Sequence, residues 1–433
     1  AAGHLASISS SNTGGASVSY TYDSLNRLHT AVDSHLGTTT YSYDDASNLA
    51  SAAYSNGVQY GFNYDQLNRL KQIATQQTGY SYQLGPTGNK TSGLELNNRQ
   101  ATWTYDGIYR LTGETISNAP SGKNGSLSYT LDPVGNRLSD SSTLSGVSPV
   151  SGTYSADDEL SAETYDPNGN VTATGGKSFT YDAENHLVSM GGTVTLVYDG
   201  DGNRVSKTVN GVTTKYLVDD LNPTGYPQIM DELTNGAVTR TYTDGLQRIG
   251  QYQVVSNTWT PSFYGYDGFG TVRNLTNSVG AITDTYEYDA FGNHWTVSGT
   301  TPNEMLYRGE QFDSDLGLYY LRARYYNPLT GRFLSRDPDD HELIGPDGYP
   351  ADPKSLRKYL YAGGDPINAK DPTGRGEIFD YFFARGTGAL NTNAYVRLGL
   401  GWNNVIKCLV FRLAIGSAGA LIHWHYDFWD YCP

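Results

Sequence analysis

The segment SYTYDSLNRL, residues 19–28, sets the pattern for most of the chain. It returns as TYSYDDASNL (40–49) and GFNYDQLNRL (61–70), so that successive Tyr-Asp pairs lie 21 residues apart. Later copies include TWTYDGIYRL (102–111), SFTYDAENHL (178–187) and TYEYDAFGNH (285–294). A unit that recurs in this way indicates a fold built by stacking one supersecondary element many times.

Each copy predicts a β-hairpin. Large side chains alternate before the aspartate, as Tyr20 and Tyr22 do, and this two-residue period is typical of one face of a strand. Residues rich in Gly, Asn and Pro follow the aspartate and favour a turn, whose backbone an aspartate can hydrogen-bond. A second strand then begins. Stacked hairpins would bring the tyrosines of neighbouring copies together, where aromatic pairs add about 0.5–1.5 kcal/mol beyond the buried area.

The composition agrees with a β protein and limits its partners. The 433 residues include 50 glycines and 36 tyrosines, and only 17% are charged. The net charge of −15 is carried by residues 1–375, because 376–433 hold four acidic and four basic side chains. An acidic body repels phosphate backbones, so we expect the repeat region to bind no nucleic acid.

A second motif follows the repeats. It is the segment YRGEQFDSDLGLYYLRARYYNPLTGRFLSRDP (307–338), whose part LGLYYLRARYYNPLTGRFLSRDP (316–338) is too charged for a core strand and too aromatic for a loop. It resembles the Rhs-associated core region, and residues 18–296 resemble the YD repeats of the Rhs family. The same region occurs in bacterial Rhs toxins, in the C component of insecticidal toxin complexes and in teneurins.

The resemblance implies an all-β fold. A spiralling antiparallel β-sheet of YD-repeat hairpins is expected to close into a hollow barrel-like shell, followed by a short C-terminal tail of mixed or helical structure. We therefore divide the chain into a YD-repeat β-shell (1–300), an Rhs-associated core that caps the shell and carries the autoprotease motif (301–375), and a variable tail (376–433) as candidate enclosed cargo.

The resemblance also implies self-cleavage. Arg324 in RARYY matches the family's core arginine, and Asp337 in SRDP matches its first catalytic aspartate. Asp371 in DPTGR matches the aspartate of the family's Asp-Pro-x-Gly-Leu motif, after which the chain is cut. The predicted cleavage site is therefore the bond between Arg375 and Gly376, and the predicted enzyme is a single-turnover aspartyl autoprotease.

The chain departs from the family motif in two places. Arg375 stands where the family has leucine, and the segment between Asp337 and Asp371 is enlarged and acidic. Within that segment, Asp365-Pro366 is a possible substitute for either carboxylate.

The chemistry of paired carboxylates suits peptide hydrolysis. One must be ionised to activate water, and the other must be protonated to give a proton to the leaving amide. Two carboxylates in one site cannot both ionise easily, so their pKa values separate, and Arg324 could hold one in its charged form. The alternative is structural, because Asp-Pro and Asp-Pro-x-Gly both begin turns.

The tail, residues 376–433, has a different composition. Its run NNVIKCLVFRLAIGSAGALIHW (403–424) is long enough to span a bilayer, which takes about 20 residues. Lys407 and Arg412 lie inside it, however, and each costs about 2.5–3.5 kcal/mol at mid-membrane. We therefore expect the shell to cover the tail, and only a released tail to contact a membrane. Its Cys408 and Cys432 could be bridged in an exported protein or occur unpaired by chance.

No cofactor and no metal are expected. The chain has no phosphate-binding glycine loop, and His423, His425 and Asp427 would need a further ligand to hold zinc. We expect a bacterial protein, secreted or at the cell surface, whose further partner is a component of a secretion system or an N-terminal plug. Two other functions stay open: an exported module that binds glycans or cell-wall polymers through exposed tyrosines, and an inert scaffold that does not cleave itself.

Overall fold

The computed structural model describes residues 4–145, 147, 149–338, 357–376 and 378–379. Over these residues the chain is almost entirely β, with two short 3-10 helices, η1 (Tyr307–Gly309) and η2 (Tyr361–Gly364). The all-β class predicted from the repeats is confirmed. Within this described part, no helix is long and apolar enough to cross a membrane. The tail from 380 onward, with both cysteines and the His423, His425 and Asp427 group, lies outside the described residues.

The repeats form two large antiparallel sheets in which strands follow one another in chain order. The first sheet has 13 strands: β1 (Ser7–Ser9), β2 (Ser17–Tyr22), β3 (Leu28–Asp33), β4 (Gly37–Tyr43), β5 (Leu49–Ala53), β6 (Gln59–Tyr64), β7 (Leu70–Ala74), β8 (Gly79–Leu84), β9 (Lys90–Glu95), β10 (Gln100–Tyr105), β11 (Leu111–Ser117), β12 (Gly125–Leu131) and β13 (Arg137–Ser142).

The second sheet has 14 strands: β14 (Thr164–Tyr165), β15 (Val171–Thr174), β16 (Lys177–Tyr181), β17 (Leu187–Met190), β18 (Val194–Tyr198), β19 (Arg204–Val209), β20 (Val212–Asp219), β21 (Gln228–Thr234), β22 (Ala237–Asp244), β23 (Arg248–Val255), β24 (Thr258–Tyr266), β25 (Val272–Thr276), β26 (Ile282–Tyr288) and β27 (His294–Ser298). The break between the sheets lies between the end of β13 at Ser142 and the start of β14 at Thr164.

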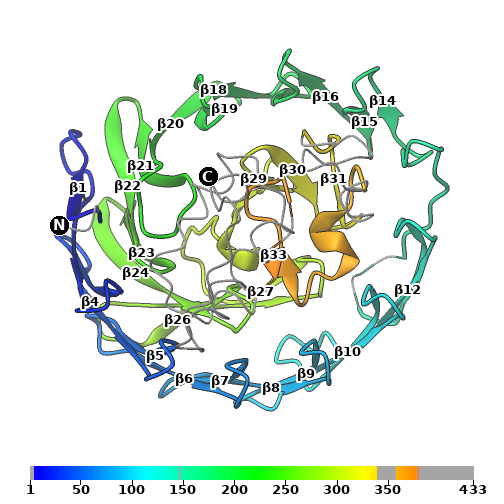
Figure 1. Ribbon diagram of the computed structural model, residues 1–433. Helices are drawn as coiled ribbons and strands as arrows, with labels where there is room; N and C mark the ends of the chain where they lie inside the picture. Colours follow the sequence, from blue (N-terminus) through cyan, green and yellow to red (C-terminus); the bar gives the residue numbers. More distant parts are fainter. Residues whose placement is uncertain (1–3, 146, 148, 339–356, 377, 380–433) are drawn as a thin grey trace, which may run out of the picture.

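The two sheets wind as a spiral. The first sheet forms much of an outer wall, and the later strands of the second sheet turn inside it (Figure 1). Contacts between distant residues hold the layers together. The Asp231 carboxylate accepts from the Ala16 amide at 3.0 Å, and the Tyr20 hydroxyl donates to the Asp244 carbonyl at 3.0 Å. The predicted spiralling antiparallel sheet is therefore confirmed.

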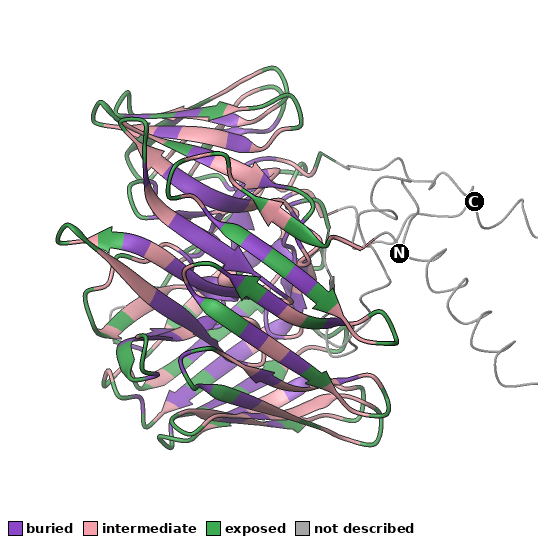
Figure 2. Cartoon of the chain, turned by 90° about the vertical axis from the view of Figure 1, so that its left-hand side faces the viewer, coloured by how far each residue is buried: buried purple, intermediate pink, exposed green. Residues whose placement is uncertain are grey.

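The sheets do not close into a barrel in the described part of the chain. Strands β1 and β13 are the edges of the first sheet, and β14 and β27 are the edges of the second. A second layer covers the aromatic inner face of the first sheet (Figure 1). Ile249 and Phe263 of the inner strands pack with Tyr20, Tyr41 and Tyr60 of the wall. Along the wall strands, buried and exposed residues alternate (Figure 2).

In the repeats with a Tyr-Asp pair, the aspartate stabilises the turn. One carboxylate oxygen of Asp23 accepts from the amides of Leu25 and Arg27, both at 2.9 Å, and the other accepts from Arg27 Nε at 2.7 Å. Asn26, inside the turn, has a φ of 61°, which asparagine tolerates better than most residues. The Asp-x-x-Asn-Arg pattern is thus a self-contained turn.

In most repeats the tyrosine of the Tyr-Asp pair ties one repeat to the one before it. Its hydroxyl donates to the carbonyl of the residue that begins the preceding hairpin's second strand. Tyr43 donates to Leu28 at 2.7 Å, and Tyr64 donates to Leu49 at 2.9 Å. The same contact joins Tyr105 to Lys90, Tyr181 to Val171, Tyr198 to Leu187, Tyr266 to Arg248 and Tyr288 to Val272. A row of tyrosines, half-buried or buried, therefore links successive repeats in both sheets.

A small cap sheet lies in the middle of the ring (Figure 1). It consists of β28 (Gln311–Asp313), β29 (Leu318–Leu321), β30 (Arg324–Asn327) and β31 (Arg332–Phe333), and β32 (Ala369–Lys370) pairs with β33 (Ile378–Phe379) nearby. Buried charges fix the cap to the wall. The Asp313 carboxylate accepts from Arg204 and, at 2.6 Å, from Lys207 Nζ, both on β19.

Candidate active site

The hairpin between β29 and β30 presents the candidate arginine. Leu321 lies opposite Arg324 across the two strands, so Arg322 and Ala323 form a two-residue turn, and Arg322 has a φ of 61°. Such turns suit the twist of a β-hairpin but require positive φ values. Arg324 is only 3% exposed, and its guanidinium carbon lies 3.7 Å from the centroid of the Phe333 ring. The surrounding packing therefore fixes the Arg324 side chain.

Arg324 brings the two candidate aspartates together. Its Nη2 atom donates to Asp337 Oδ2 at 2.8 Å and to Asp371 Oδ2 at 3.2 Å. Because both oxygens contact the same nitrogen, they are at most about 6.0 Å apart. One water molecule can bridge carboxylates at such a separation. The proximity that direct cooperation requires is present, and the catalytic roles of these residues stay a prediction.

Asp371 also contacts the bond that is predicted to break. Its Oδ1 atom accepts from the amide of Gly376 at 3.1 Å and from the amide of Arg375 at 3.2 Å. The Gly376 nitrogen belongs to the Arg375–Gly376 peptide. A carboxyl group at this position lies within hydrogen-bond distance of the nitrogen that must receive a proton when the bond breaks.

The two aspartates have different surroundings. Burial raises the pKa of Asp371, although Arg324, the two amides and Thr373 act to lower it. Asp371 is 2% exposed, whereas the side chain of Asp337 is 16% exposed. The backbone amide of Asp337 donates to the Lys358 carbonyl at 2.9 Å, and this contact fixes its position. Asp371 is therefore favoured in its neutral form, whereas Asp337, which contacts the same guanidinium, lies nearer to solvent.

Glycine is required at position 374. Gly374 has a φ of +66°, and a Cβ atom there would lie 2.5 Å from the Leu321 carbonyl oxygen and 2.9 Å from the Arg324 amide nitrogen. Its own carbonyl accepts from Arg324 Nε. The Asp-Pro-x-Gly motif thus packs directly on the cap hairpin at Leu321 and Arg324. The sequence alone does not reveal this contact.

Asp365 is not part of this arrangement. Its carboxylate accepts from the Asn368 amide at 3.1 Å and from Asn368 Nδ2 at 3.0 Å. Burial raises its pKa to about 6. Asp371-Pro372, rather than Asp365-Pro366, therefore provides the second carboxylate that contacts Arg324.

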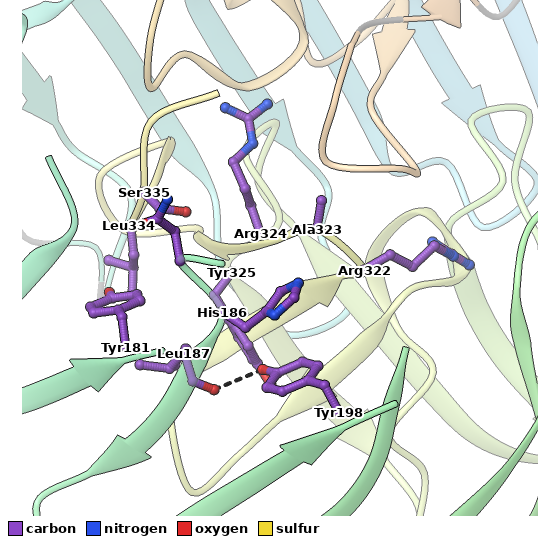
Figure 3. Close-up of a pocket in the computed structure, with 11 residues that line it drawn as sticks. Tyr181, His186, Leu187, Tyr198, Arg322, Ala323, Arg324, Tyr325, Leu334 and Ser335 are labelled. Atoms are coloured by element: carbon purple, nitrogen blue, oxygen red, sulfur yellow. Dashed lines mark hydrogen bonds between the residues drawn. The ribbon is translucent and has the colours of Figure 1, made fainter. Parts of the chain in front are cut away.

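A cavity of about 10 Å³ lies between the cap hairpin and the second sheet. Figure 3 shows Arg322, Ala323 and Arg324 on one side of it and His186 and Tyr198 on the other. This volume is close to the least that holds one water molecule. The candidate site is thus packed against the wall of the spiral.

Sequence reasoning found three of the site residues and missed another. Arg322 belongs to the same RARYY motif as Arg324, and its Nη1 atom donates to the Pro372 carbonyl, within the Asp-Pro-x-Gly motif. The signal in the sequence was that Arg322 and Arg324 are two residues apart, which places both at the same hairpin turn.

A separate cluster consists of Asp182, Glu184 and His186, whose possible metal-ligand atoms lie within 4.8 Å of one another. However, Asp182 already binds the Glu184 and His186 amides of its own turn, as other repeat aspartates do.

Known proteins are similar in sequence to parts of the chain. Residues 4–149 match the family described as Teneurin YD-shell. The tRNA nuclease WapA of Bacillus subtilis (strain 168) is 34% identical over 265 residues, which cover 57% of this chain and 11% of WapA. The chain therefore spans about a tenth of the length of this curated relative.

Solved structures show the same fold. The crystal structure of TcdB2-TccC3-Cdc42 aligns with a TM-score of 0.65 at 19% identity, covering 87% of this chain and 21% of that one. The crystal structure of TcdB2-TccC3 without the hypervariable C-terminal region aligns with a TM-score of 0.66, also at 19% identity, over 83% and 20%. The tyrosine-linked hairpins and the central cap define a YD-repeat shell. The chain is thus similar to the Rhs/YD-repeat family, in sequence over residues 4–149 and in fold over most of its length.

Proposed function

We propose that this chain is the shell part of a polymorphic toxin, which encloses its own residues 376–433 and releases them by one cut between Arg375 and Gly376. One observation carries the proposal: Arg324 contacts both Asp337 and Asp371, and Asp371 contacts the amide nitrogen of the bond to be cut. The relatives give support in kind. WapA is a nuclease by name, and the TccC3 structures refer to a hypervariable C-terminal region.

The proposed reaction is general acid–base hydrolysis. The Arg324 guanidinium favours a negative charge on Asp337, which takes a proton from water as the water oxygen attacks the Arg375 carbonyl carbon. Asp371, favoured in its neutral form by burial, gives its proton to the Gly376 nitrogen. The carbon–nitrogen bond breaks, leaving a carboxylate on Arg375 and an amine on Gly376.

The geometry favours a single turnover. After the cut, the new chain end at Arg375 stays attached to Gly374 and Thr373, whose carbonyls accept from Arg324 Nε and the Ala323 amide. The product therefore occupies the site in which another substrate would have to bind. The proposed enzyme acts once, on its own chain.

The proposed location is outside the producing cell, secreted or on a bacterial surface, in keeping with the toxin names of the relatives. Enclosure of the tail and a secretion-system or plug partner belong to the same proposal. The glycan-binding alternative receives less support, because hydroxyls of the repeat tyrosines, such as Tyr43 and Tyr64, bind the neighbouring repeat. These tyrosines form the wall rather than an exposed platform.

The test is an Asp337→Asn exchange in the full chain. Asparagine keeps the size of the side chain and an oxygen for Arg324 but cannot serve as the base. Freshly purified wild-type protein should yield a fragment that begins at Gly376, and D337N should remain whole while its shell resists protease as the wild type does. A wild-type chain that stays intact through long incubation would favour the inert scaffold.

A further inference from the structure

The turn of the cap hairpin contacts the cleavage motif in an ordered way. Three successive residues of the turn donate to three successive carbonyls of the motif. Arg322 Nη1 donates to Pro372, the Ala323 amide donates to Thr373 at 3.2 Å, and Arg324 Nε donates to Gly374. This one-to-one register fixes the segment that leads directly into the Arg375–Gly376 bond.

Arg322 is itself held from two further sides. Its Nη1 atom donates to Glu310 Oε2 at 2.8 Å, and its Nε atom donates to the Pro227 carbonyl at 2.9 Å. Its guanidinium carbon lies 5.5 Å from the centroid of the Tyr226 ring. Glu310 precedes β28 of the cap, whereas Tyr226 and Pro227 belong to the loop between β20 and β21 of the wall. One side chain thus joins cap, wall and cleavage motif.

The contacts of Arg322 differ in kind from those of Arg324. Within the described residues, the hydrogen bonds of Arg322 reach neither Asp337 nor Asp371. Arg322 therefore contacts the backbone of the cleavage motif rather than the carboxyl groups. Its hydrogen bond to the Pro372 carbonyl helps to fix where the Asp371–Gly376 segment lies.

We propose that Arg322 is a positioning residue for the cut. It holds the Pro372 carbonyl so that the neighbouring Asp371 and the Arg375–Gly376 bond stay in register with Arg324 and Asp337. A misplacement of about 1 Å in a preorganised site can cost about 10²-fold in rate. Lysine cannot take over this role, because a single ammonium group does not reproduce the planar fork that serves three acceptors. This proposal rests on the proposed self-cleavage.

A repeat turn supplies a matched control. Arg110 Nη1 donates to the carbonyls of Asp132, at 2.7 Å, and Pro133, at 3.1 Å, in the Asp-Pro-Val-Gly turn that begins at Asp132. Arg110 thus contacts the carbonyls of an Asp-Pro turn, as Arg322 does. This turn, however, is not the one whose aspartate shares Arg324 with Asp337. An Arg110→Lys exchange should remove a comparable contact and leave the cut unaffected.

The experiment follows cleavage of pulse-labelled full chains after cell-free synthesis, across a series of pH values. We expect R322K to cleave about 10- to 100-fold more slowly than wild type, with a pH profile of the same shape, and R110K to cleave within about twofold of wild type. Only chains whose shell resists protease are scored. If R322K does not fold, the double variant Arg322→Met with Glu310→Gln replaces it in the experiment, because it removes both partners of the ion pair and leaves no unpaired charge. We expect the double variant to cleave slowly as well.

The outcomes separate the two proposals. A wild-type chain that does not cleave contradicts the proposed function. Cleavage in wild type together with R322K or double-variant rates within twofold of it overturns the positioning role alone. A shifted pH profile in folded R322K chains would also overturn it, because it would show that Arg322 acts on a titrating group.

Discussion

The sequence Asp-Pro-x-Gly occurs in two regions of the molecule, and the comparison shows what turns a local motif into a candidate site. In the repeats, Asp166 binds the amides of Asn168 and Asn170, both at 2.9 Å, and the Asn170 side chain. All its partners lie within four residues. In the cap, Asp371 binds its own turn too, but its second oxygen contacts Arg324 from a distant hairpin. The two turns therefore differ in a tertiary contact, the one between Asp371 and Arg324.

Burial decides how the two kinds of aspartate titrate. Burial raises the pKa of Asp65 in its repeat turn, but the hydrogen bonds from Arg69 and Leu67 and the charge of Arg69 together outweigh burial, so the pKa of Asp65 is lowered. Burial of Asp371 is complete enough to outweigh Arg324, and its pKa is raised. A carboxyl group beside an arginine can therefore favour either form, depending on how much water reaches it.

The largest expected effect on the cleavage rate comes from replacing the aspartate of the cap turn, and the aspartate of a repeat turn serves as its control. Asp371→Asn should slow self-cleavage by about 10²–10⁴-fold, since it removes the proposed general acid. Asp166→Asn should leave the rate unchanged, because that aspartate serves only its turn. Densitometry of the full chain and its fragment over time measures both. Equal rates for D371N and wild type would contradict the distinction between the turns.

A smaller effect is expected from glycines with positive φ. Gly374→Ala should slow the cut by about 10²-fold, because its Cβ would push the motif away from Leu321 and Arg324. Gly57 has a φ of +88° and open space around it, so Gly57→Ala should cost only about 1–2 kcal/mol of stability. If G374A cleaved as fast as G57A, the close approach would have no part in the reaction.

The pH dependence should reflect the neutral form of Asp371. A carboxyl group whose pKa is raised by folding stabilises the native state fully below its unfolded pKa, and this contribution is lost as pH rises through the folded pKa. The same neutral form is the proposed acid, so the rate should fall by about tenfold per pH unit above the raised pKa. Rates measured in a buffer series check this. A rate that rises steadily through that range would assign the acid role elsewhere.

The smallest effect concerns the wall. Tyr64→Phe removes the hydroxyl that donates to the Leu49 carbonyl and should lower the free energy of unfolding by about 1 kcal/mol. Tyr109, which is 45% exposed, offers a control in Tyr109→Phe, for which little change is expected. Denaturant titration of uncut D337N chains carrying each exchange gives both values. Cleavage itself should not respond to Y64F.

Much of the wall could be predicted because its information is local. The alternation of Tyr20 and Tyr22 gave a strand, and the residues after Asp23 gave a turn, and both are found. The inward turn of the second sheet could not be predicted, because it depends on contacts between residues as distant as Ala16 and Asp231. No periodicity in the sequence records such a pairing.

The candidate site also has residues that could be predicted from the sequence and residues that could not. The family resemblance pointed to Arg324, Asp337 and Asp371, which the structure brings together. Sequence alone could not choose between Asp365 and Asp371, since each precedes a proline and either could have been buried beside an arginine. It also gave no role to Arg322, because the partner of a long side chain is set by how the cap packs on the wall.

The most direct test of the central claim is intact-mass measurement and N-terminal sequencing of the full chain, made as wild type and as D337N. The proposed site predicts that the wild type separates into two pieces whose new amino terminus is Gly376, and that D337N stays a single chain with the same protease-resistant shell. A whole wild-type chain, a cut at another bond, or a cut that persists in D337N would contradict it.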